Sequence, residues 1–168
     1  MPYITHAQLA ERPGSKELAE VATAAHEQLV DYELMEATLL GEDRSSWPAD
    51  EVARADDALL RVDDAEADAE SVIDGFLGRR GYLPLDPVPG IVTTWCRSIT
   101  RYFLHKDRLS DDSSDPIVRD YKDAMKLLQL TAEGKFSLGV DDDKAQQGAG
   151  EPMVTTGSTV FRDNLRDY

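Results

Sequence analysis

The chain is poor in the residues that most often carry covalent or metal chemistry, with one cysteine and three histidines among its 168 residues. The lone Cys96 cannot form an internal disulfide, and its helical spacing from Val92, Ile99 and Phe103 predicts a small core residue in a reducing, cytoplasmic setting. No apolar run reaches the roughly 18 residues of a membrane span, and no basic-then-apolar leader opens the chain. We therefore expect neither secretion nor membrane insertion.

Catalytic constellations are also missing. His6, His26 and His105 fall on separate segments without ligand spacing, so we expect no metal or catalytic role for them. The acidic run at residues 141–143 lacks the glycine turn and distal glutamate of a calcium loop, and no phosphate loop or dinucleotide fingerprint occurs. These absences predict a protein that is not an enzyme and that has no cofactor.

What the chain has in abundance is negative charge, which is unevenly distributed. It carries 33 acidic and 18 basic side chains, a net charge of -15. Residues 17–74 hold 18 acids and 3 bases, whereas residues 75–135 hold 8 acids and 10 bases. Such a field repels phosphate backbones and so disfavours duplex DNA binding through counterion release. It suits either a solvated helix face or a surface past which DNA slides, and in the second case we expect Asp56, Asp63 and Asp64 to face a DNA channel.

Apolar periodicity and capping signals predict a mostly α fold, a bundle of about four to five helices. Thr5 is expected to cap a short helix to about Arg12, and Ser15 a second helix ending at Gly41. Pro48 is expected in the first turn of a long spine helix that reaches about Arg79. The last two helices are expected at residues 90–105 and from Asp115 to Gly134. Together they predict one helical domain, residues 1–140.

Between the spine and the next helix, the chain contains three prolines within nine residues. Prolines remove amide donors and push the preceding residue into extended conformations, so this segment predicts a stiff corner. The residues expected to build the corner are Gly81, Tyr82, Pro84, Pro87 and Pro89.

Basic side chains recur with helical spacing on two of the predicted helices. They are Arg97 and Arg101 on one, and Arg119, Lys122 and Lys126 on the other. Two interpretations remain open. These residues pair with the acidic helix of their own chain, or they pair with the acidic flank of a neighbouring copy and so form a closed ring.

Residues 141–168 are polar and glycine-containing, and they should not fold alone. Some apolar character returns near the end, at Val160, Phe161 and Leu165, next to Arg162. We expect an extended C-terminal arm whose last part lies on another chain, at a subunit or portal interface.

Several segments resemble a family of Mu-like tailed-phage and prophage proteins, the head-to-tail adaptor or head-completion family. The matching residues are Ile73 to Leu77, Arg80 to Leu85, Val88-Pro89, Ile99 to His105, Tyr121 to Ala124, Gly134 to Gly139 and Val160 to Leu165. The resemblance implies a ring of about twelve copies beneath the portal, in the virion neck. It also implies contact with portal, stopper or tail-terminator proteins, DNA that passes without specific binding, and synthesis in the bacterial cytoplasm.

The first half departs from that family pattern, because residues 15–50 are expected to add an acidic helix. Two alternatives to an adaptor stay open. One is a stopper or tail-terminator neck protein, whose usual architecture is rich in strands. The other is a small acidic regulator or DNA-mimic inhibitor, which would explain the charge without a ring.

Overall fold

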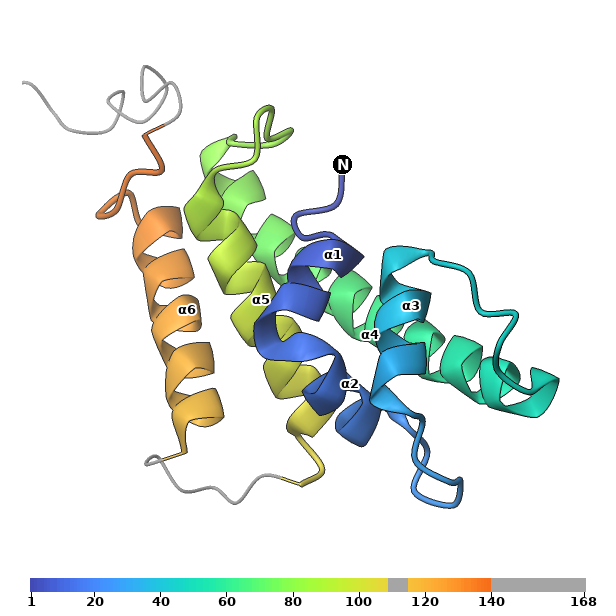
Figure 1. Ribbon diagram of the computed structural model, residues 1–168. Coiled ribbons are helices and arrows are strands. Elements are labelled where there is room, and N and C mark those ends of the chain that lie inside the picture. The colour runs from blue at the N-terminus through green and yellow to red at the C-terminus, as the bar shows by residue number, and fades with distance from the viewer. Residues whose placement is uncertain (109–114, 140–168) are drawn as a thin grey trace, which may run out of the picture.

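A computed structural model describes residues 1–108 and 115–139. Within these ranges the chain forms helices and no strand, which confirms the mostly α class (Figure 1). The helices are α1 (His6–Leu9), α2 (Ser15–Ala22), α3 (Tyr32–Leu40), α4 (Ala49–Leu77), α5 (Gly90–His105) and α6 (Pro116–Ala132), with a π-type turn η1 (Ala10–Gly14) and a 3-10 turn η2 (Gly78–Arg80). The predicted C-terminal arm, with Val160, Phe161, Arg162 and Leu165, lies outside the described residues.

Helix α4 is the predicted spine. Its 29 residues give a length of about 44 Å. Pro48 directly precedes the first turn, where Asp50 and Glu51 complement the positive end of the helix dipole. The buried side of α4 is a stripe of small and branched residues: Ala55, Ala58, Val62, Ala65, Ala69, Ile73 and Leu77. Because four of these are alanines, neighbouring helices approach the α4 backbone closely.

Helix α5 packs between α4 and α6 (Figure 1). Its predicted stripe is buried at Val92, Trp95, Cys96 and Ile99. Asp115 caps α6 by accepting a hydrogen bond from the backbone of Ile117, as its position predicts. The α5–α6 interface contains a stacked ring pair, Tyr102 and Tyr121, whose centroids lie 3.9 Å apart. The two helices are thus joined mainly by apolar and aromatic contacts.

The Pro-rich corner connects α4 to α5 as predicted. Gly81 ends η2 with φ of 70°, a left-handed conformation that favours glycine. Leu85 is buried in the core, while Pro84 and Pro87 lie exposed on either side of it. Pro89 immediately precedes α5. The corner is therefore anchored by one apolar side chain and ends where the next helix begins.

The single helix predicted from Ser15 to Gly41 is wrong. Helix α2 stops at Ala22 and α3 starts only at Tyr32. The Thr23 hydroxyl donates to the Ala19 carbonyl at 2.6 Å and accepts from the Val30 amide at 3.3 Å, which closes the intervening loop. Periodicity across residues 23–31 was accidental, since a loop-closing threonine overrides it.

The ends of these two helices also differ in part from expectation. Gly14, not Ser15, is the residue before α2, and Asp31 caps α3 through the amides of Glu33 and Leu34. Gly41 ends α3 in a left-handed conformation, as predicted. Leu29, in the loop that replaces the middle of the predicted helix, and Tyr32, at the start of α3, are 55% and 52% exposed.

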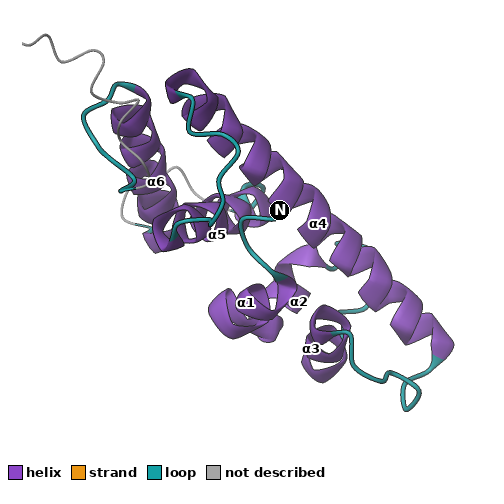
Figure 2. Ribbon diagram, turned by 90° about the horizontal axis from the view of Figure 1, so that it is seen from above, coloured by secondary structure: helices purple, strands orange, loops and turns teal. Residues whose placement is uncertain are grey.

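The helices that cover α4 fall into two groups: α5 and α6 form one, and the three N-terminal helices form the other. Figure 2 shows α1, α2 and α3 gathered on one side of α4. Helices α2 and α3 both pack on α4, and α2 also touches α5. Ile4, Leu9, Leu18, Leu34 and Met35 join the same hydrophobic core as the α4–α5 interface. The spine is therefore covered by two helical groups that share one core.

Candidate functional site

A cleft lined by arginines lies where η1 and α2 meet α5 and α6. Its volume is about 370 Å³. We call it the basic cleft and define it by these lining residues: Arg12, Pro13, Glu17, Thr94, Arg97, Ser98, Arg101, Ile117 and Asp120. Three positive side chains and two negative ones thus surround one hollow.

Arg101 in this cleft has its partner within the same chain. Its Nε and Nη2 atoms donate to the two carboxylate oxygens of Glu17 at 2.5 and 2.8 Å. His105 Nε2 lies 2.9 Å from the same carboxylate. Burial acts to raise the pKa of Glu17, but the hydrogen bonds from His105 and Arg101 outweigh it and lower the pKa to about 2. For Arg101, pairing inside the chain is therefore the observed arrangement.

Arg97 differs from Arg101. Its Nε atom is buried and makes no hydrogen bond, and no ion pair to Arg97 forms within residues 1–108 and 115–139. A buried guanidinium donor without an acceptor costs free energy comparable to a lost hydrogen bond. Arg97 also lines the cleft, and its planar guanidinium has the shape that pairs with a carboxylate.

The three basic residues predicted on α6 lie outside this hollow. Arg119, Lys122 and Lys126 are all exposed. Arg119 lies 3.4 Å from the neighbouring Asp120, a surface contact of little energetic weight. The structure thus brings Arg97 and Arg101 together and leaves the α6 residues on a separate, solvent-facing side.

The acids expected to face a channel are all on α4, yet two of them contact the N-terminal half of their own chain. Asp56 accepts a hydrogen bond from Arg44, and Asp63 lies 2.7 Å from His6 Nε2. Their side chains remain 52% and 42% exposed. Asp64 is exposed. All three therefore still present charge to solvent.

Further acids on α4 hold the N-terminal segment, a set of contacts that helical periodicity does not predict. The Tyr3 amide donates to Glu70 at 2.5 Å, and the Tyr3 hydroxyl donates to Asp74. Burial and these two carboxylates raise the pKa of Tyr3. Asp63, Glu70 and Asp74 are spaced by seven and then four residues, so helical periodicity places them on one face of α4. The sequence does not indicate that the N-terminal segment packs on that face.

One acid on that face is buried. Glu66 is 9% exposed, with His6 Nε2 at 3.9 Å. Burial raises its pKa to about 7, helped by repulsion from Glu70 and Asp63 and opposed by His6. His6, treated as isolated by sequence spacing, thus meets two carboxylates that are distant along the chain.

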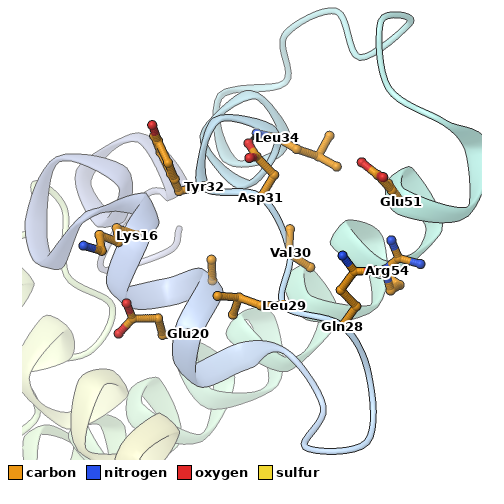
Figure 3. A pocket seen from close by; sticks show the side chains of 11 residues that line it. Lys16, Glu20, Gln28, Leu29, Val30, Asp31, Tyr32, Leu34, Glu51 and Arg54 are labelled. Atoms are coloured by element: carbon orange, nitrogen blue, oxygen red, sulfur yellow. Dashed lines mark hydrogen bonds between the residues drawn. The ribbon is translucent and has the colours of Figure 1, made fainter.

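A second hollow, of about 350 Å³, lies between α2, the loop 23–31, α3 and the start of α4 (Figure 3). Lys16 and Glu20 border it on α2, and Glu51 and Arg54 border it on α4. Leu29 contributes an exposed apolar side chain. The lining contains no histidine, cysteine or serine.

Cys96 is buried, as its spacing predicts. Burial raises the pKa of its thiol to about 12, with a smaller opposing effect from the Thr100 hydroxyl. The thiolate form is therefore scarce at neutral pH, and Cys96 acts as a core residue rather than a nucleophile.

The fold and the charged surfaces define a mostly helical protein with an acidic spine and an arginine-lined cleft. Among the helices of the described ranges, none is both long enough and apolar enough to cross a bilayer. The chain belongs to the family described as "Bacteriophage Mu, Gp36", which matches residues 3–156. That range includes residues 15–50, where an addition to the family pattern is expected.

Two relatives give the same assignment. The chain is 36% identical over 110 residues to "Mu-like prophage FluMu protein gp36" of Haemophilus influenzae, covering 64% of this chain and 75% of that protein. It is 31% identical over 103 residues to "Gene product J" of Escherichia phage Mu, covering 61% and 69%. No solved structure matched. The expected Mu-like family is confirmed, and the chain is a phage-type protein.

Proposed function

We propose that this protein is a structural subunit of the phage neck, a head-to-tail connector that forms a ring beneath the portal. Family membership supplies the phage context. The connector role rests on the resemblance to helical adaptor proteins and on two surfaces of opposite charge. In this proposal the subunit catalyses no reaction, needs no cofactor and acts by binding sister copies and neighbouring neck proteins.

The observation that carries the proposal is the unsatisfied Arg97 in the basic cleft. Arg101 has Glu17, but the buried Nε of Arg97 has no acceptor in the described chain. The acidic outer face of α4, with exposed Asp68, offers a carboxylate of the complementary charge. Because the two surfaces lie on different parts of one subunit, their pairing between copies is head-to-tail, which gives a ring when the rotation between copies closes. In this proposal it closes after about twelve copies.

The remaining parts of the proposal concern DNA and other neck proteins. Asp56, Asp63 and Asp64 would face the ring's lumen, where negative charge repels phosphate and lets DNA pass without adhesion. The exposed bases of α6 and residues 141–168, with Val160, Phe161, Arg162 and Leu165, would contact the portal, a stopper or a tail terminator. A subunit with these contacts would be made in the bacterial cytoplasm and assembled at the virion neck.

The direct test is the assembly state of the full chain, alone and mixed with the portal protein of the same phage. Light scattering and electron microscopy should show a ring on the portal. Arg97→Glu should abolish ring formation, whereas Arg79→Glu, the same charge change at an exposed position outside the cleft, should leave it intact. Rings formed equally well by both variants would contradict the proposed interface.

Loss of the gene separates the connector from its alternatives. A phage lacking a connector should accumulate filled or partly filled heads and free tails that fail to join. A stopper or tail terminator is a weaker candidate because the described residues are helical without strands. The one feature that favours an acidic regulator or DNA mimic is the negative charge. If normal virions assembled without this protein, that result would contradict the connector role and support the regulator.

A further inference from the structure

A cluster of one histidine and two acids, which shares no residue with the basic cleft, joins the N-terminal segment to α4. It consists of His6 at the start of α1 and of Asp63 and Glu66, which lie three residues apart on α4. His6 Nε2 lies 2.7 Å from Asp63 Oδ1 and 3.9 Å from Glu66 Oε2. One nitrogen and two carboxylate oxygens thus converge, all within 4.8 Å of one another.

Glu66 makes this more than a group of surface charges. Its residue is 9% exposed, and its carboxylate accepts no hydrogen bond from residues 1–108 or 115–139. A buried carboxylate is strongly disfavoured unless it is paired with a cation or hydrogen-bonded. His6 Nε2 lies closer to Asp63 than to Glu66, so the one cationic contact of the Glu66 carboxylate within the described residues is a long one of 3.9 Å.

We propose that His6, Asp63 and Glu66 bind a divalent transition-metal ion of the Zn²⁺ type. An imidazole nitrogen with two carboxylate oxygens is a ligand set that zinc accepts, with water completing four-coordination. Two carboxylates and a neutral imidazole balance the ion's charge. Mg²⁺ and Ca²⁺ prefer sites made of oxygen ligands alone, so the imidazole selects against them.

The geometry needs only small movements to accept the ion. Ligand atoms about 2.0–2.2 Å from a tetrahedral zinc lie about 3.3–3.6 Å from one another. The His6–Asp63 separation of 2.7 Å must open by about 0.6–0.9 Å, and the His6–Glu66 separation of 3.9 Å must close by about 0.3–0.6 Å. The Asp63 and Glu66 oxygens, which lie within 4.8 Å of each other, must close by up to about 1.5 Å. His6 and Asp63 side chains are 37% and 42% exposed, which gives the ion a route from solvent.

The bound ion would act as a clasp between α1 and the middle of α4. In its absence the N-terminal segment is held there by Tyr3 and by the His6–Asp63 contact. Because the ion binds only the folded arrangement, it stabilises that arrangement by a free energy that grows with the logarithm of the free ion concentration above the dissociation constant. The inference concerns the N-terminal docking alone and stands whether or not the subunit forms a ring.

The test is calorimetric titration of the full-length, chelator-treated chain with ZnCl₂ in a non-chelating buffer. We expect one equivalent to bind and the melting temperature to rise, with no comparable response to MgCl₂ or CaCl₂. Binding of Co²⁺ should give the intense visible absorption of a four-coordinate site. A chain that shows no saturable zinc binding would overturn the proposal.

Variants locate the site. His6→Ala and Glu66→Gln should each weaken zinc binding by at least about tenfold. Asp64→Asn, next to the cluster but exposed, and His26→Ala, an exposed histidine elsewhere, should not change it. Because His6 is partly exposed, its replacement should preserve the fold, which circular dichroism checks. Zinc affinity that is unchanged in His6→Ala would also overturn the assignment.

Discussion

The two groups of helices that cover α4 are held to it in different ways. Helices α5 and α6 join the spine through apolar contacts, such as that of the buried Ile99, and join each other through the stacked Tyr102–Tyr121 pair. Helices α1 to α3 contribute apolar residues too, but they add polar contacts to acids, as His6 does with Asp63 and Arg44 with Asp56. The first group is thus insensitive to ionisation, whereas the second depends on it.

The largest effect should come from the apolar group. Ile99 is fully buried in α5, and Ile99→Ala leaves a cavity that the packed helices only partly close. We expect the free energy of unfolding to fall by about 3 kcal/mol, measured by urea denaturation. Leu60→Ala, at a leucine that is 61% exposed, should change it by less than about 0.5 kcal/mol. Equal losses in both variants would contradict the assigned core.

Glu17 joins the two groups, because it lies on α2 and bonds to Arg101 and His105 of α5. Glu17→Gln should cost about 1–2 kcal/mol at neutral pH, since the pair is only partly buried. The folded pKa of about 2 lies below the ordinary value of 4.5. The stabilisation is therefore complete above about pH 4.5 and lost as the pH falls towards 2.

Urea denaturation at several pH values between 2 and 6 checks this dependence. The difference in stability between the wild type and Glu17→Gln should shrink as the pH falls through that window. Glu20→Gln, an exposed neighbour on α2, should run parallel to the wild type. A difference that stays constant from pH 6 to pH 2 would show that Glu17 contributes through packing rather than through charge.

A substitution at Gly134 probes the turn that follows α6. It follows α6 with φ of 74°, and a Cβ there would lie 3.0 Å from the Arg80 guanidinium. Gly134→Ala should destabilise by about 1 kcal/mol, because the left-handed conformation is unfavourable for alanine and Arg80 must shift. Gly75→Ala, within α4 and with open space around it, should be neutral or stabilising in the same thermal melts.

The smallest effect should be local. Thr5 caps α1 and forms a capping box with Gln8. Thr5→Ala should cost about 0.5–1 kcal/mol. We expect faster amide exchange confined to the first dozen or so residues, measured by hydrogen exchange, while α5 and α6 keep their protection. Exchange that rises equally in all helices would mean that the N-terminal group does not open independently.

The sequence predicted the α4–α5–α6 part of the fold well, because each helix there carries a continuous apolar stripe and clear boundary residues. Pro48, Gly81 and Asp115 mark boundaries as expected. It failed across residues 23–31, where Thr23 closes a loop by hydrogen bonds that no periodicity records. Apolar periodicity and capping residues therefore predict long helices such as α4, α5 and α6 better than short helices, such as α2 and α3, that are separated by a hydrogen-bonded loop.

Candidate site residues followed the same division. Arg97 and Arg101 were found because helical spacing places them on one face of α5, and the cleft confirms that they lie together. Glu17 and Glu66 are not singled out by the sequence, and His6 is expected to have no role, since their contacts join residues more than 50 positions apart. The Mu-like family was recognisable from motifs, whereas the cleft required three-dimensional packing.

The alanines of α4 have a practical consequence. Ala55, Ala58 and Ala69 are wholly covered by other helices, but Ala53 and Ala67 point outward. Spin labels attached to cysteines introduced at those two positions would lie on the exposed side of α4. The pair would be separated by about 21 Å along a straight helix. Electron paramagnetic resonance on that pair would report whether the spine bends when the protein enters a virion.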